Sequence, residues 1–149
     1  MVQNSLLSYR YQTISHKLKK ITIHLIEDDI SQRDSIESLL VYKDYIVKSY
    51  SAANNFLKNV PFERPAIIIA DIQLPDLSGV DLHRILMEKN ITCPIIFISG
   101  EASIQQSIDA MKQGAIEFLL KPFERDQLLS AVVRGLEQDV AYMRSYVVQ

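Results

Sequence analysis

Polar residues that could do chemistry stand at the points where this chain's predicted strands end. They are Glu27 and Asp28 after ITIHLI, Asp71 after AIIIA, Ser99 after PIIFI, and Lys121 after EFLL. A parallel sheet gathers the carboxyl ends of its strands at one edge, so these side chains are expected to meet in space. Three acids, a hydroxyl and an amine would line one crevice. This combination is typical of a site that binds a metal ion and a phosphoryl group.

The residue types suit that chemistry. Mg²⁺ prefers carboxylate oxygens and keeps several waters, so Glu27, Asp28 and Asp71 could supply the protein ligands. A phosphoryl group is itself negative and needs positive charge opposite it, which Lys121 and the cation would provide. A carboxylate can act as the nucleophile and form an aspartyl-phosphate. Asp71 is the best candidate because it follows the strongest predicted strand.

Each residue also has an ordinary interpretation. An acid at a strand end often caps the next helix, Ser99 followed by Gly100 is a common turn, and Lys121 followed by Pro122 is a common helix entry. The joint pattern at successive strand ends favours one shared site.

Three stretches of the chain resemble the receiver domains of response regulators in two-component signalling. They are HLIEDD, IIIADIQLPDLSGVDL and PIIFISGEASIQQSIDAMKQGAIEFLLKPF. Their order and spacing match as well, and the resemblance covers residues 21–140. The last stretch looks most like the FixJ/NarL class, whose members carry LuxR-type DNA-binding domains.

The resemblance implies a role for each candidate residue. Asp71 would accept a phosphoryl group from a histidine kinase or a phosphotransfer protein. Asp28 would bind Mg²⁺, or Mn²⁺ in its place, and Glu27 stands where the family more often has Asp. The Ser99 hydroxyl would contact the bound phosphoryl group, and Lys121 would pair with it.

The resemblance alone predicts a role for two further residues and the conformation of one peptide bond. The backbone carbonyl of Gln73 would complete the metal ligands. Phe118 matches an aromatic position that turns inward on activation. The Lys121–Pro122 peptide bond is expected to be cis.

Apolar runs alternate with helical patterns along the chain. Strands are predicted at residues 21–26, 45–50, 66–70, 94–98 and 116–120. A helix is predicted after each strand, and Gly114 is expected to end the fourth helix. This alternation predicts an α/β fold with a doubly wound parallel sheet and five helices. The resemblance adds a flavodoxin-like strand order, 2-1-3-4-5.

Composition is consistent with one domain. The 149 residues carry a formal net charge of −2. This charge does not favour direct binding to DNA, whose backbone is negative. The single cysteine, Cys93, precludes an internal disulfide and fits a cytoplasmic location. No apolar run reaches the roughly 20 residues of a membrane span.

His24 and His83 lack zinc-ligand spacing and are expected to be structural or exposed.

Three segments are distinguished along the chain. Residues 1–20 form a basic extension, residues 21–139 the receiver domain, and residues 140–149 the end of the last helix or the start of a linker. Val140 and Met143 prolong the apolar stripe of that helix beyond what the domain needs.

Three functions remain to be compared. The first is the receiver of a transcription regulator that binds DNA through an output domain absent here, with a homodimer forming through the fourth helix and fifth strand on phosphorylation. The second is a stand-alone receiver that acts by protein contact. The third, a haloacid-dehalogenase-type phosphatase, needs an acid two residues after its nucleophile, and Gln73 occupies that position. The chain is therefore predicted to be a signalling domain that catalyses only its own phosphorylation and dephosphorylation.

Overall fold

The computed structural model describes residues 21–101 and 104–148, in which strands and helices alternate. The strands are β1 (Thr22–Ile26), β2 (Ile46–Tyr50), β3 (Ala66–Asp71), β4 (Ile95–Ser99) and β5 (Glu117–Leu120). The helices are α2 (Ile30–Tyr42), α3 (Ala53–Leu57), α4 (Gly79–Glu88), α5 (Ile104–Lys112) and α6 (Arg125–Val148). Each strand begins and ends within one residue of its predicted bounds. The predicted extension at residues 1–20 lies outside the described residues.

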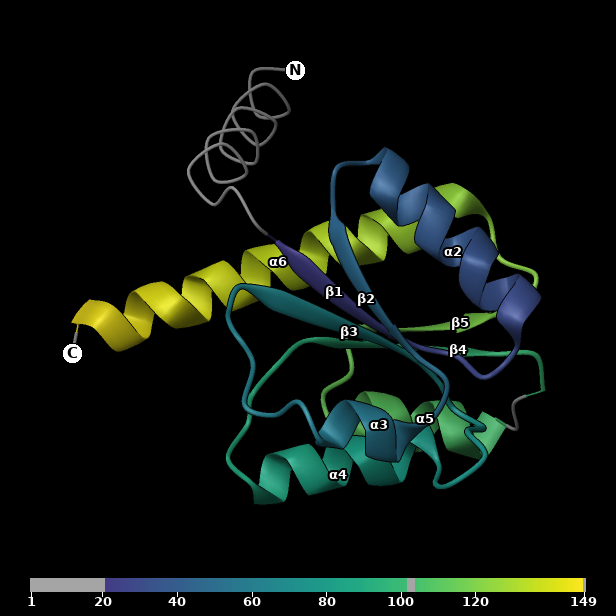
Figure 1. Cartoon of the computed structure of the whole chain (residues 1–149). Coiled ribbons are helices and arrows are strands. Elements are labelled where there is room, and N and C mark those ends of the chain that lie inside the picture. Colours follow the sequence, from purple (N-terminus) through teal and green to yellow (C-terminus); the bar gives the residue numbers. More distant parts are fainter. Residues whose placement is uncertain (1–20, 102–103, 149) are drawn as a thin grey trace.

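The five strands form one parallel sheet in the order β2-β1-β3-β4-β5. The predicted fold class and strand order are therefore confirmed. Helices α2 and α6 cover one face of the sheet, and α3, α4 and α5 cover the other (Figure 1). Long α6 continues beyond the sheet towards the C-terminal end of the chain.

The central strand β3 explains why the sheet needs helices on both faces. Its side chains alternate between two cores, with Ile67 and Ile69 packed towards α2 and α6 and Ile68 packed towards α3 and α4. All six residues of β3 are buried. An uninterrupted apolar strand is expected when both faces of a parallel sheet are covered.

The carboxyl ends of the strands meet at one edge of the sheet. Ile26, the residue before Glu27, pairs in register with Ala70, the residue before Asp71. Asp71 ends β3, and the Lys121 backbone N–H donates to the Ser99 carbonyl over 2.7 Å. This backbone register brings residues far apart in the sequence to one place.

Two glycines act where a side chain would be costly. Gly114 has a φ of 99° just after α5, so the predicted helix end is confirmed. At Gly79, a Cβ atom would lie 2.8 Å from Cε1 of Phe97 and 3.0 Å from the carbonyl oxygen of Asp71. Glycine therefore allows α4 to begin directly beside the end of β3.

Three residues lie deeper than the sequence suggests. His24 and His83 are both buried, at 1% and 7% exposure. His24 packs among the rings of Tyr50, Phe56 and Phe62, and its Nδ1 lies 3.1 Å from the Tyr50 hydroxyl. Val140 is only 6% exposed and belongs to the core beneath α6, so it is a packing residue of the domain.

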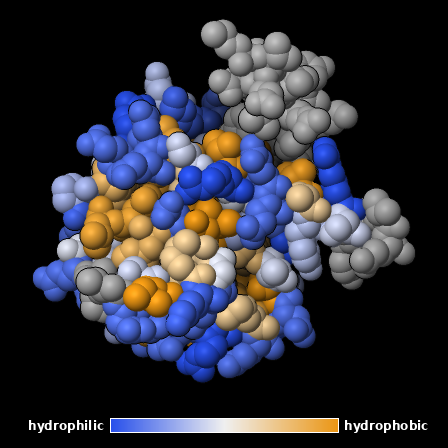
Figure 2. Space-filling model, turned by 180° about the vertical axis from the view of Figure 1, so that it is seen from behind, coloured by the Kyte–Doolittle hydropathy of each residue, from blue (hydrophilic) through white to orange (hydrophobic). Residues whose placement is uncertain are grey.

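Apolar side chains are exposed beside the β5 edge of the sheet. Ile108 and Met111 of α5 are 40% and 45% exposed, and Leu120 of β5 is 57% exposed. Seen from behind, the molecule shows apolar surface among hydrophilic groups (Figure 2). Exposed apolar area of this kind is a candidate contact surface.

Candidate functional site

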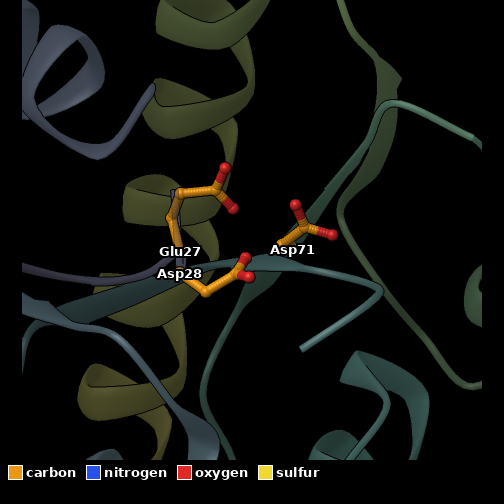
Figure 3. A group of neighbouring side chains, drawn as sticks. All are labelled: Glu27, Asp28 and Asp71. Carbon is orange, nitrogen blue, oxygen red and sulfur yellow. The ribbon is translucent and has the colours of Figure 1, made fainter. Parts of the chain in front are cut away.

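Three carboxylates converge at the carboxyl edge of the sheet. One oxygen from each of Glu27, Asp28 and Asp71 lies within 4.8 Å of the others. Glu27 and Asp71 are buried and Asp28 is exposed, so the group opens to solvent on one side. The three side chains face a common space between the ends of β1 and β3 (Figure 3). Acids packed this closely repel one another unless a cation or a proton intervenes.

Lys121 supplies one positive charge. Its Nζ lies 2.8 Å from Oε1 of Glu27 and 2.7 Å from Oδ2 of Asp71, so one ammonium bridges two carboxylates. Burial by itself lowers the pKa of Lys121, but its hydrogen bonds to the two acids raise it above the ordinary value. The Lys121–Pro122 peptide bond is cis, as the resemblance to receiver domains implied.

Glu27 remains incompletely compensated. Burial, followed by the interaction with Asp71, raises the pKa of Glu27 from 4.5 to about 7, although Lys121 acts in the opposite direction. Oε2 of Glu27 is buried and has no hydrogen-bond partner among the described residues. A further positive group in this position would lower the energy of the site.

The backbone after β3 holds the Asp71 carboxylate in place. The Gln73 backbone N–H donates to Oδ1 of Asp71 over 2.8 Å, while Lys121 binds the other oxygen. The Gln73 side-chain amide donates to the Glu101 carbonyl over 3.3 Å. Gln73 therefore joins the Asp71 carboxylate to the loop that follows β4.

Ser99 and Phe118 do not line the pocket that contains the carboxylates. The buried Ser99 hydroxyl donates to the Glu101 carbonyl over 2.9 Å and accepts from the Glu101 N–H over 3.2 Å. Phe118 is half-buried, pairs in register with Phe97 on β4, and packs against the core beneath α4 and α5. Glu101 was not among the residues predicted for the site, although its position directly after the Ser99–Gly100 turn was a usable signal.

The site is an open pocket of about 290 Å³. Its lining residues are Glu27, Asp28, Asp29, Gln32, Asp71, Gln73, Gly100, Glu101 and Lys121. Asp29 accepts from the Gln32 backbone N–H and caps α2, so it has a structural role beside the pocket. Arg33 is a neighbour that sequence reasoning missed, and its Nη1 donates to the Glu27 carbonyl over 2.9 Å.

The donor set fits a hard divalent cation. All three side-chain groups offer carboxylate oxygens, the ligands that Mg²⁺ prefers, and the exposed side leaves room for water. The unpartnered buried oxygen of Glu27 is the specific feature that a cation would satisfy.

Comparison with known proteins identifies the family. Residues 23–133 match the family described as the response regulator receiver domain, so the chain belongs to that family. It is a signalling family, and the prediction made from the three sequence stretches is confirmed.

Named relatives agree with this assignment. The chain is 35% identical over 120 residues to the transcriptional regulatory protein FixJ of Rhizobium meliloti, covering 80% of this chain and 59% of that protein. It is 38% identical over 120 residues to nodulation protein W of Bradyrhizobium diazoefficiens, covering 80% of this chain and 53% of that protein. The chain thus spans a little over half the length of these relatives.

Solved structures match in the same region. The response regulator StyR superposes with a TM-score of 0.82 at 33% identity, covering 87% of this chain and 66% of that one. FixJ-N superposes with a TM-score of 0.74 at 34% identity, covering 79% and 94% respectively. Within the described residues, no helix combines the length and apolar character needed to cross a membrane.

Proposed function

We propose that this chain is a phosphorylation switch in which Asp71 accepts a phosphoryl group from a histidine kinase or a phosphotransfer protein. The observation that carries the proposal is the shared ammonium of Lys121, which bridges Asp71 and Glu27 beside the exposed carboxylate of Asp28. A nucleophile and a fixed positive charge are thereby set in an open, acid-lined pocket. This is the arrangement that phosphoryl transfer requires.

The metal ligands would be Glu27, Asp28, Asp71 and the backbone carbonyl of Gln73, holding Mg²⁺ or Mn²⁺. When bound, the divalent cation supplies positive charge that offsets the negative oxygens of the incoming phosphoryl group. Lys121 contributes a second positive charge, and hydrogen bonds to its two acids favour the ammonium form.

The proposed reaction at Asp71 has two steps, phosphorylation and hydrolysis. An Asp71 carboxylate oxygen attacks phosphorus in line, a P–O bond forms and the P–N bond to the kinase histidine breaks, with its electron pair left on the imidazole. Lys121 stays beside the Asp71 carboxylate and faces the charge that arrives. Water later attacks phosphorus and releases inorganic phosphate, which regenerates the carboxylate. The chain is thus a switch that catalyses only its own phosphorylation and dephosphorylation.

Ser99 and Phe118 would carry the signal away from Asp71. The Ser99 hydroxyl is bonded to the Glu101 backbone in this state, so reaching the phosphoryl group requires it to leave Glu101. Its movement would draw the loop after β4 towards Asp71 and vacate space into which half-buried Phe118 turns. The result would be two alternative packings with phosphorylation favouring one.

The output surface would be α5, β5 and α6. Its exposed apolar side chains include Ile108, Met111 and Leu120, which suit self-association when Phe118 turns inward. DNA binding and control of transcription would belong to an output domain outside this chain, and the location would be cytoplasmic. The relative named transcriptional regulatory protein FixJ supports this choice over a stand-alone receiver.

Labelling with acetyl phosphate tests the nucleophile. In the presence of Mg²⁺, Asp71→Asn should abolish the hydroxylamine-sensitive phosphoryl label because the amide cannot form an acyl phosphate. Asp34→Asn is the matched control, since Asp34 is an exposed acid on α2 outside the pocket. Full labelling of Asp71→Asn would refute the assignment.

Sedimentation tests the switch. Ser99→Ala should accept the label on Asp71 but self-associate less than the parent when beryllofluoride mimics the phosphoryl group, because the hydroxyl no longer couples the site to Phe118. A parent that binds beryllofluoride without a change in association or in amide exchange across residues 104–123 would show that output uses another face.

A further inference from the structure

A second buried ion pair lies at the amino edge of the sheet, opposite the candidate site. Asp139 of α6 is fully buried, and its carboxylate is bonded to Arg64 in the loop before β3. Arg64 Nη2 donates to Oδ1 of Asp139, and Nε donates to Oδ2 over 3.3 Å. Neither residue of this pair belongs to the proposed phosphorylation site, which lies at the opposite ends of the strands.

The carboxylate of Asp139 is also bonded to the sheet itself. The backbone N–H of Ala66, the first residue of β3, donates to Oδ2 of Asp139 over 2.9 Å. Asp139 therefore receives three hydrogen bonds from residues more than seventy positions away in the sequence. A buried carboxylate with this many donors is fully satisfied and fixes the position of its helix.

The contacts on either side of Asp139 extend the same face of α6. One turn earlier stands Gly135, where a Cβ atom would lie 3.4 Å from Cβ of Pro94 and 3.6 Å from Cδ1 of Ile67, so the helix backbone runs close to the sheet. One turn later stands Tyr142, and Cζ of Arg64 lies 4.3 Å from the centre of its ring. Positions 135, 139 and 142 are four and three residues apart and share a helix face.

We propose that Arg64 and Asp139 form a clasp that makes α6 a rigid arm of the sheet. The clasp ties the helix to β3 at the place where α6 leaves the sheet (Figure 1). A part of the protein joined to the end of this arm would then keep its orientation relative to the sheet. The inference does not depend on Asp71 being the phosphoacceptor, because it concerns a different edge of the sheet.

Hydrogen exchange of the full chain, followed by mass spectrometry, tests the clasp. In Asp139→Asn and in Arg64→Leu, amides of residues 137–145 should exchange about tenfold faster than in the parent because local opening becomes easier. Amides of β3 and β4 should stay within about twofold of the parent. Acetyl phosphate labelling of both variants reports separately on whether the candidate site remains folded.

Glu117→Gln is the matched control. It removes a different ion pair of α6, between Arg134 and Glu117 at 2.8 Å, whose side chains are 52% and 34% exposed. This variant should leave exchange of residues 137–145 unchanged. The proposal is overturned if exchange there matches the parent in both clasp variants, if it rises equally along the whole chain, or if Glu117→Gln raises it as much as Asp139→Asn does.

Discussion

Each of two edges of the sheet contains a partly buried cation bonded to a buried carboxylate, but only one of these clusters is complete. At the amino edge, Asp139 receives three hydrogen bonds and is paired with a single guanidinium. At the carboxyl edge, one ammonium of Lys121 is divided between Glu27 and Asp71. Asp28 adds a third acid there, open to solvent.

The two clusters differ in how completely their charges are compensated. A satisfied pair has nothing to gain from a ligand, so it serves to hold α6 against the sheet. The carboxyl-edge cluster has an excess of negative charge, an unpartnered buried oxygen on Glu27 and a raised pKa on the same residue. A divalent cation, as proposed for this site, would relieve each of these features.

The largest expected effect comes from breaking the complete pair. Asp139→Ala leaves Arg64 partly buried without its carboxylate, and the free energy of unfolding should fall by about 3–5 kcal/mol. Urea denaturation measures this loss. Glu117→Ala, which breaks the more exposed pair with Arg134, should cost no more than about 1 kcal/mol. Equal losses in the two variants would contradict the distinction between the clasp and an ordinary surface pair.

The second largest expected effect is a pH dependence of the free energy of unfolding, caused by Glu27 at the carboxyl edge. The pKa of Glu27 is raised from 4.5 to about 7. Between these two pH values the folded protein therefore keeps a proton on Glu27 that the unfolded chain has lost. Without metal, the contribution of Glu27 to stability should therefore be fully present below about pH 4.5 and should fall, by on the order of 2 kcal/mol, as pH rises to about 7, with pocket water screening part of the charge. Denaturation in EDTA across this range measures the slope.

Glu27→Gln is the control for that slope. The amide has a similar shape and no charge, so the fall in the free energy of unfolding between those pH values should largely disappear. The same fall in parent and variant would mean that another group is responsible.

The smallest expected effect comes from the exposed acid. Asp28→Asn removes one of three neighbouring negative charges, so the metal-free protein should become more stable by about 0.5–1 kcal/mol. The stabilisation that Mg²⁺ gives the parent should shrink in the same variant, because a ligand is lost. Thermal unfolding with and without Mg²⁺ measures both quantities. Asp34→Asn should change neither, and a parent-like response of Asp28→Asn to Mg²⁺ would remove Asp28 from the metal ligands.

Much of the fold followed from local patterns in the sequence. The buried strand β3 reads as AIIIA, and an apolar run of this kind predicts a strand covered on both faces. The site followed from the same reasoning, since Asp71 and Lys121 stand at strand ends and parallel strands end at one edge. The distances between Lys121 and the two acids agree with that expectation.

The sequence by itself thus determined the strands, the helices between them and the edge at which the polar residues gather, because these depend on periodicity and chain direction. Only the tertiary structure decided which charges are paired. Arg64 and Asp139 are 75 residues apart, and nothing near either one in the sequence indicates the other. The Ser99 hydroxyl likewise has its partner in Glu101 because of the path of one loop. Such pairings depend on how α6 and the loops cross the finished sheet, and local preference carries no information about that crossing.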